Sequence, residues 1–336
     1  MKAMRSRLSA LVLCALAGLS TAAQREDPAK SPPAATSQVP AVSSSAAPAT
    51  QSENARANPN LTPDKDGKLS PEQMRELTRS VAQNYRDNYK KERDYTYIER
   101  DVENSMGGKG EVKSTEVRTY DIVDIYGEQV RRMIAKDDKP LDAREAAKEE
   151  DKIQKMVDKR KNESEDERKK RLEKEAKQHE EGRKFVSEVA DSHDFTLVGT
   201  ELVDGREAWV IDGDPRPGYE PQDKGANFVH KFRGRLWIDK GDLQLSKMEI
   251  EAVDTASVGW VLARIHKGTR VTYEQLRMTD EIWLPKHLTY KFDARVALFK
   301  GYNIDGEQTY RNYRKFGASS KIVGMGEVKE PEKEQR

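Results

Sequence analysis

The chain has almost no cysteine. Cys14 is the only one among 336 residues, and it lies inside an N-terminal apolar run. Removal of that run as an export signal leaves a chain with neither a disulfide nor a thiol nucleophile. The histidines are also few, and none has a second histidine or a cysteine at metal-ligand spacing: His179, His193, His230, His266 and His287. We therefore expect no metal and no other cofactor.

Other patterns that carry chemistry are missing too. The sequence contains no HExxH, no GxSxG elbow, no phosphate-binding loop and no dinucleotide fingerprint. Aspartate and glutamate are so numerous that no pair of carboxylates stands out. An enzyme built from residues distant in sequence is left open, but these absences favour a protein without catalysis.

Charge of one sign is not in excess. The chain has 60 basic and 59 acidic side chains, and without Lys2, Arg5 and Arg7 the balance becomes −2. A nucleic-acid-binding protein usually shows a clear basic excess, so no nucleic-acid partner is expected. Charged and apolar residues each make up 35%, which is polar for one globular domain and predicts that part of the chain is disordered or solvated helix.

No apolar run is long enough for a comfortable membrane span, which needs about 20 residues. The run from Leu8 to Leu19 is flanked by basic residues before it and by the small residues 20–23 after it. This pattern predicts a signal peptide over residues 1–23 and a periplasmic protein, with an uncleaved anchor as the alternative. Lipidation of Cys14 is not expected, because the bulky residues 11–13 precede it.

Residues 24–68 are rich in Ala, Pro and Ser and predict a flexible linker. Near its end, the segment from Thr62 to Gln73 partly matches a calcium loop, with Asp64, Asp66 and Gly67 in place. Thr62 and Gln73, however, stand where calcium requires carboxylates. The preferred interpretation is a polar turn and a helix cap made by Ser70 and Gln73.

A helix is expected from Ser70 to about Arg93, because apolar residues recur there at spacings of three and four. Three strands should follow between Asp94 and Lys136. Residues 137–182 mix acidic and basic residues three and four apart, which predicts a solvated, protruding helical insertion. Phe185, Val186 and Val189 then restore an apolar face and predict a second, short helix.

From Asp194 onward the pattern is of strands, about seven of them. Asp204-Gly205 is a strong hairpin signal. From Leu288 to Leu298 every second residue is apolar, which is the period of a strand with one dry face. The last strand is expected from Glu307 to Phe316, followed by a charged tail over 321–336. The predicted fold is α+β: a large curved antiparallel sheet of about ten strands, covered by helices.

Short motifs in this order resemble the Lol-type outer-membrane lipoprotein-sorting family, whose fold is shared by the periplasmic sigma-regulator RseB. They are Tyr95–Arg100, Asp204–Ile211, Gly234–Asp239 with Leu243–Glu249, and Ile282–Pro285. The resemblance implies an open half-barrel over residues 69–320, with helices on its concave face and acyl chains of lipoproteins or other lipids between them. The insertion at 137–182 departs from the plain carrier.

The apolar sides of the predicted strands together form a wall, and this wall with the second helix supplies the candidate lipid-binding residues. Burial of an acyl chain yields roughly 0.8 kcal/mol per methylene, so about fourteen carbons supply about 10 kcal/mol before association costs. Helices packed directly onto the wall, without a cavity, are the alternative. A structural or sensor module that contacts an envelope protein is the alternative function. The candidates are Leu236, Ile238, Met248, Ile250, Leu288, Tyr290, Phe292, Val296, Phe185 and Val189.

Overall fold

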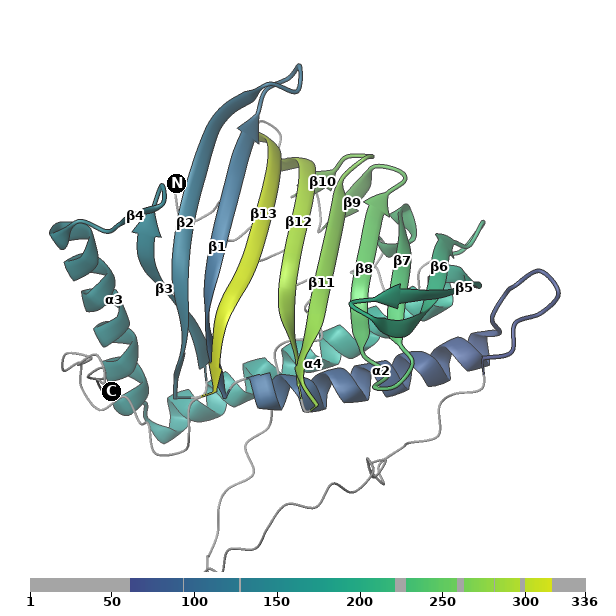
Figure 1. Ribbon diagram of the computed structural model, residues 1–336, viewed down its shortest axis with the longest axis horizontal. Coiled ribbons are helices and arrows are strands. Elements are labelled where there is room, and N and C mark those ends of the chain that lie inside the picture. Colours follow the sequence, from purple (N-terminus) through teal and green to yellow (C-terminus); the bar gives the residue numbers. More distant parts are fainter. Residues whose placement is uncertain are drawn as a thin grey trace, which may run out of the picture.

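The computed structural model describes residues 61–92, 94–126, 128–220, 228–258, 263–280, 282–296 and 300–315. These residues form one open, antiparallel sheet of 13 strands, and helices lie across one end of it (Figure 1). The predicted α+β class with a large unclosed antiparallel sheet is therefore confirmed. No helix among these residues combines the length and the apolar character needed to cross a bilayer.

The order of strands across the sheet is β4-β3-β2-β1-β13-β12-β11-β8-β7-β6-β5, with β10 paired to β12 and β9 to β10. The C-terminal strand β13 lies between β1 and β12 and so joins the N-terminal meander to the rest. The bounds are β1 Tyr95–Met106, β2 Val112–Ile125, β3 Glu128–Lys136, β4 Lys139–Pro140, β5 His193–Val203, β6 Arg206–Pro215, β7 Phe232–Asp239, β8 Leu245–Ala252, β9 Ala256–Val258, β10 Ala263–Ile265, β11 Arg270–Thr279, β12 Ile282–Val296 and β13 Lys300–Lys315.

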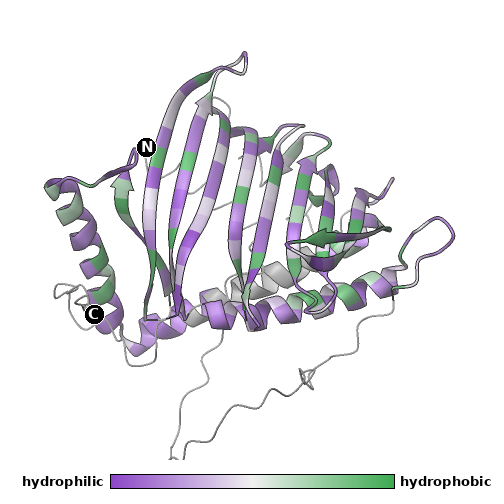
Figure 2. Ribbon diagram, in the orientation of Figure 1, coloured by the Kyte–Doolittle hydropathy of each residue, from purple (hydrophilic) through white to green (hydrophobic). Residues whose placement is uncertain are grey.

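Strand β12 has the alternation that the sequence predicts. Leu288, Tyr290 and Phe292 are buried, whereas Lys291 and Arg295 are exposed. Figure 2 shows apolar and polar residues alternating in this way along the strands. The Asp204-Gly205 turn is also as predicted, because both residues have positive φ angles, 48° and 79°. The sheet has three strands more than the expected ten. Strands β4, β9 and β10 have only two or three residues each, which is too few to show a period in the sequence.

Strand β13 begins at Lys300, seven residues earlier than predicted. The segment 301–306 contains two glycines, an asparagine and an aspartate, which are typical of a turn. In the structure these residues pair with β12 from Arg295 to Tyr290, and residues 304–306 also pair with β1. Pairing with β12, the preceding strand, and with the distant strand β1 outweighs the local preference for a turn.

The helices are α2 (Pro71–Glu92), α3 (Ala143–Lys161) and α4 (Glu165–Ser192), with a short 3-10 helix, η1 (Val229–Lys231). The predicted cap of α2 is present: the backbone N–H of Ser70 donates to Gln73 Oε1 (2.9 Å), and that of Gln73 donates to Ser70 Oγ (3.2 Å). Asp64 Oδ1 closes the turn before it by accepting two backbone N–H bonds. Because Gly67 and Leu69 also bond to β5, residues 61–68 of the predicted linker are part of the folded unit.

The charged insertion is helical, as predicted, and forms α3 and the first part of α4, but two details of the prediction are wrong. Helix α4 continues to Ser192 and takes in the predicted second helix. Helix α3 does not protrude, because its sparse apolar residues pack on β2 and β3. Ile153, with 6% of its surface exposed, contacts this layer together with Met156 and Val157. Three apolar residues at spacings of three and one form a stripe wide enough to attach a helix that is otherwise solvated.

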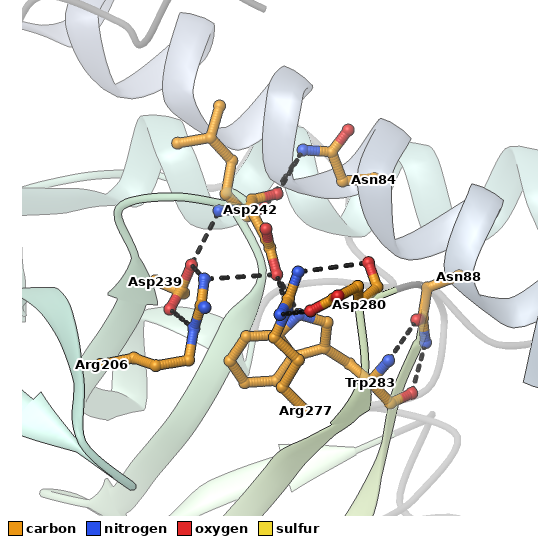
Figure 3. A network of polar contacts seen from close by, with 9 residues as sticks. Asn84, Asn88, Arg206, Asp239, Asp242, Arg277, Asp280 and Trp283 are labelled. Atoms are coloured by element: carbon orange, nitrogen blue, oxygen red, sulfur yellow. Dashed lines mark hydrogen bonds and ion pairs between the residues drawn. The ribbon is translucent and has the colours of Figure 1, made fainter. Parts of the chain in front are cut away.

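Helix α2 is fixed to the ends of the strands by side-chain amides (Figure 3). Asn88 is buried, donates to the backbone oxygen of Trp283 (2.7 Å) and accepts from its N–H (2.7 Å). Asn84 donates to the backbone oxygen of Asp242 (2.9 Å). These bonds satisfy backbone groups at the start of β12 and in the loop after β7, and so set where the helix crosses the sheet.

An ion network lies beneath this crossing. The guanidinium of Arg206 makes two bonds to Asp239 (2.7 and 2.8 Å), and that of Arg277 donates to Asp242 (2.7 Å). The indole N–H of Trp283 donates to the same Asp242 oxygen (2.8 Å). The network holds the ends of β6, β7, β11 and β12 together beside the helix (Figure 3).

Candidate functional site

One side of the sheet, which we call the inner face, is defined by a row of cross-strand neighbours that runs from β5 to β2. Residues paired across antiparallel strands project to the same side. Along this row apolar side chains give way to an amide, a carboxylate and a guanidinium. The row is Leu197, Ile211, Leu236, Met248, Tyr273, Leu288, Gln308, Asp101 and Arg118.

A second row on the inner face also changes from apolar residues on β5–β12 to charged residues on β1 and β2. It consists of Phe195, Gly213, Gly234, Ile250, Val271, Tyr290, Gly306, Glu103 and Glu116. The ring of Tyr290 lies over Gly306, where an added Cβ would come within 2.0 Å of it. The inner face thus has an apolar half on β5–β8, β11 and β12 and a charged half on β1, β2 and β3, and Tyr290 lies at the border.

The apolar half has two parts. On β5–β8, helix α2 packs directly onto the sheet, with Met74 and Leu77 against Phe195, Ile211 and Ile238. The second part centres on β12, and its members in the described part of the chain all come from strands: Val271, Leu288, Tyr290, Phe292 and Ala294, with Ile265, Tyr273, Ile304 and Tyr310 beside them. The alternative of helices lying directly on the wall therefore holds for the first part.

The inner face brings together seven of the ten predicted lipid-binding residues: Leu236, Ile238, Met248, Ile250, Leu288, Tyr290 and Phe292. Val189 of α4 packs beside the α2 cluster. The side chains of Phe185 and Val296 lie outside the described residues. A role of these residues in lipid binding stays a prediction.

The charged half was not predicted from the sequence. Glu99, Asp101 and Glu103 are only 6–7% exposed. Arg131 of β3 forms an ion pair with Glu99 and lies 3.5 Å from Asp101, and its guanidinium stacks 4.0 Å from the centre of the Tyr120 ring. One guanidinium is thus shared by two carboxylates and an aromatic ring.

The electrostatics follow from burial. Burial raises the pKa values of Glu99 and Asp101, and the charge of Arg131 opposes this shift. Burial by itself would lower the pKa of Arg131, but Glu99, Tyr120 and Asp101 raise it above its ordinary value. The pKa of Glu92, at the end of α2, is raised by burial to about 7. Protonation of these carboxyls is therefore easier than in water.

The segment Tyr95–Met106 explains why the charged half was missed. Its apolar Ile98 and Val102 alternate with the carboxylates, and the usual pattern would turn Ile98 and Val102 inward. In the structure the carboxylates face inward instead, and Ile98 and Val102 lie on the opposite face. The available signal was that Tyr95 and Tyr97, both buried, share the phase of Glu99 and the two acidic residues after it.

Comparison with known proteins gives matches in structure alone. No family model matches the chain, and no curated protein matches it in sequence. The solved structures to which it is similar include an outer membrane lipoprotein-sorting protein domain from Vibrio parahaemolyticus, with 11% identity, a TM-score of 0.31 and coverage of 76% of this chain and 95% of that one.

A second match is a LolA superfamily protein from Nitrosomonas europaea, with 9% identity, a TM-score of 0.26 and coverage of 75% of this chain and 97% of that one. A third is the complex of MucA and MucB from Pseudomonas aeruginosa, with 13% identity, a TM-score of 0.22 and coverage of 73% of this chain and 99% of that one. The resemblance seen in the sequence and these matches name the same families. At such TM-scores they carry no conclusion about ligand, partner or compartment, and the fold is defined by this chain's own strands.

Proposed function

We propose that this chain is a non-enzymatic binding protein of the bacterial periplasm, which holds acyl chains of lipids or lipoproteins against the apolar half of its inner face. The observation that carries the proposal is the cluster around β12, where Leu288, Tyr290 and Phe292 form an apolar wall with residues of neighbouring strands. Such a wall offers a continuous apolar surface for contact with a ligand.

The amphipathic inner face supports the same function. An acyl chain gains roughly 0.8 kcal/mol for each methylene removed from water. The polar end of a lipid needs hydrogen-bonding or charged partners nearby, because burial of an unpaired polar group is costly. The charged half of β1 and β2 supplies such partners next to the wall.

The test begins with the lipids of the purified protein. The full chain, isolated from a bacterial periplasm, should yield fatty acyl species by mass spectrometry, and the delipidated protein should bind a fluorescent fatty acid. Ile250→Asp, at a half-buried position of the inner face, should weaken that binding at least tenfold. Lys291→Asp, at an exposed position of the opposite face, is the matched control and should leave it unchanged.

The result that overturns the proposal is equally definite. A folded protein without extractable lipid and without fatty-acid binding is not a carrier of acyl chains. Equal binding by Ile250→Asp and Lys291→Asp would exclude the inner face as the site. Thermal melting of both variants separates loss of binding from loss of fold.

A protein-interaction module is the second candidate, and the open part of β5 favours it. This strand ends the sheet, and among the described residues its outer edge is bonded at Phe195 and Leu197 to the segment 67–69. Beyond that, Val198 and Leu202 are 52% and 72% exposed. An exposed edge strand presents backbone N–H and C=O groups that can pair with a strand of another chain. Leu202→Lys should abolish capture of an envelope protein and leave fatty-acid binding intact if this candidate is right.

A further inference from the structure

Strand β5 ends one side of the sheet (Figure 1), and the segment 67–69 of the same chain runs along the first half of its outer edge. The backbone N–H of Leu69 donates to the oxygen of Phe195 (2.9 Å), and that of Leu197 donates to the oxygen of Gly67 (2.8 Å). The two segments thereby form an antiparallel bridge. The edge can thus hold a further strand, and its own chain covers only one half of it.

The second half of β5 is open. A bulge between Leu197 and Gly199 separates it from the first half, and residues 198–202 are all exposed. Val198 is 52% exposed and Leu202 is 72% exposed. Among the described residues, only β6 bonds to the backbone of this stretch. An apolar strand with a free edge is the kind of surface that takes up another chain.

The backbone groups of the open half alternate in direction. Strand β5 leads into a two-residue turn, and the residues that flank such a turn form a hydrogen-bonded pair, here Val203 with Arg206. Hydrogen-bonded and non-hydrogen-bonded pairs alternate along an antiparallel ladder. Glu201 therefore bonds to β6, whereas the N–H and C=O groups of Thr200 and Leu202 point away from the sheet. These groups are available to an incoming strand.

The open half also presents little charge. Glu201 is the one charged residue of the stretch 198–202. Its side chain is turned toward β7, where it accepts a hydrogen bond from the indole N–H of Trp237 (2.8 Å). Proteins commonly place charged side chains, lysine above all, on free edges to keep other strands away. This edge lacks that protection.

The other end of the sheet has such protection. On β3 the backbone N–H of Met133 donates to Glu149 Oε1 (3.0 Å), and Lys152 Nζ donates to the backbone oxygen of Arg131 (3.4 Å). Both charged side chains come from α3, and the short strand β4 pairs with the last residues of β3. One end of the sheet is thus closed by charged side chains, and the other is left open and apolar.

A second copy of this chain fits the open edge poorly. In a pair of β5 strands around a two-fold axis, one residue opposes its own copy. With Thr200 at the axis, Val203 of the other copy would meet Gly67, which already bonds to this edge. With Glu201 at the axis, like charges would oppose each other. With Leu202 at the axis, the hairpin turn shortens the ladder to a few residues.

We propose that the open edge of β5, residues 198–202, takes up an extended, uncharged and largely apolar segment of another protein as an additional strand. Main-chain bonds to Thr200 and Leu202 supply affinity, and the apolar edge selects against charged segments. An apolar side chain of the segment lies beside Leu202 and removes it from water. The inference is independent of acyl-chain binding and specifies the partner of the second candidate function.

The experiment reads amide hydrogen exchange by NMR in the isotopically labelled full chain. The probes are blocked hexapeptides that alternate valine with threonine, with lysine or with glutamate, and a valine–threonine peptide methylated on every internal backbone nitrogen. In the free protein the amides of Thr200 and Leu202 should exchange at least roughly tenfold faster than that of Glu201. The valine–threonine peptide should slow both, and it should bind roughly tenfold more tightly than either charged peptide. The methylated peptide should not bind.

Two variants and a control test the residues. Leu202→Lys places a charge on the edge, and Thr200→Pro removes an outward donor while keeping the bonds to β6. Each should weaken binding of the valine–threonine peptide roughly tenfold. Val112→Lys, at an apolar position of another hairpin that is 55% exposed, is the matched control and should bind as the wild type does. Melting curves establish that the variants are folded, and either folded variant suffices for the test.

Several outcomes would overturn the inference. They are protection of Thr200 and Leu202 in the free protein, no binding of the valine–threonine peptide, and equal binding of all peptides or by the variants and the control. A dimer in sedimentation that Leu202→Lys converts to a monomer would assign the edge to a second copy instead. Fatty-acid binding should be the same in all variants, so failure at this edge leaves the acyl-chain function standing, and failure of fatty-acid binding leaves the edge standing.

Discussion

Gly306 shows how a single missing side chain shapes the inner face. It is paired with Tyr290 on β12 and with Glu103 on β1. The absence of a Cβ lets the Tyr290 ring lie flat across β13, at the border between the apolar and the charged half. Aromatic residues that cover a glycine of the neighbouring strand are a recognised device of sheet packing.

Replacement of this glycine should therefore be costly. In Gly306→Val the new side chain must displace a buried ring, and we expect a loss of about 1–3 kcal/mol in the free energy of unfolding. Gly301→Val, in the same strand, is the control: nothing lies within 4 Å of a Cβ there, and a change within about 0.5 kcal/mol is expected. Urea unfolding of both variants gives the comparison, and equal losses would contradict this account of Gly306.

Glu92 should make stability depend on pH. Its pKa in the folded protein is about 7, above the ordinary value of 4.5, because burial disfavours the charged form. The folded state then binds the proton more tightly than the unfolded state. The stabilisation is complete below about pH 4.5 and is lost as the pH rises through about 7.

Glu92→Gln isolates this effect. Since glutamine cannot ionise, the variant should match the wild type near pH 5 and exceed it near pH 8, by roughly 2 kcal/mol once the partial exposure of Glu92 is allowed for. Glu76→Gln, at an exposed position of the same helix, should show no such difference. The measurement is the free energy of unfolding at the two pH values. An equal difference between Glu92→Gln and the wild type at both would refute the raised pKa of Glu92.

At the scale of elements, α2 is held by a polar anchor in addition to its apolar face. Asn88 satisfies both the N–H and the carbonyl of buried Trp283. A helix that relied on Met74 and Leu77 alone would be fixed at its N-terminal half. The second attachment sets the position of its C-terminal half beside β12.

Asn88→Ala should leave both backbone groups of Trp283 without partners, with an expected loss of about 2–4 kcal/mol. Arg79→Ala, at an exposed position of the same helix, should cost no more than about 0.5 kcal/mol. Denaturant unfolding monitors the global loss, and hydrogen exchange of the α2 amides shows whether the helix opens first. Unchanged exchange in Asn88→Ala would contradict the anchoring role.

At the scale of the whole molecule, an open sheet with an amphipathic face should be stabilised by its ligand. A ligand that binds only the folded state at 100 times its Kd adds about 2.7 kcal/mol. For a domain of this size that corresponds to roughly 5–10 °C in Tm. Dodecanoic acid should produce such a rise in the delipidated protein by scanning calorimetry, and no rise in Ile250→Asp. A rise of equal size in both would place binding elsewhere.

Much of the architecture could be predicted because its causes are local. The period of two in β12, the cap at Ser70 and the turn at Asp204-Gly205 depend on neighbouring residues, and each is present. The early start of β13 and the packing of α3 could not be predicted in this way. Both depend on contacts with other elements, which the local sequence does not encode. Strand β13 pairs with β12 and with the distant strand β1, and α3 packs on β2 and β3.

The sequence by itself determined the strands, the helices and the apolar half of the inner face, since alternation within one strand is enough to separate a dry side from a wet one. Only the tertiary structure decided which side of β1 faces inward. In that strand either of the two alternating sets of residues could face inward, because one contains buried tyrosines and the other contains Ile98 and Val102. A shift of the register by one residue exchanges the two sets. The pairing of β1 with β2 and β13 selected the phase of Asp101, and so placed carboxylates rather than Ile98 beside the apolar wall.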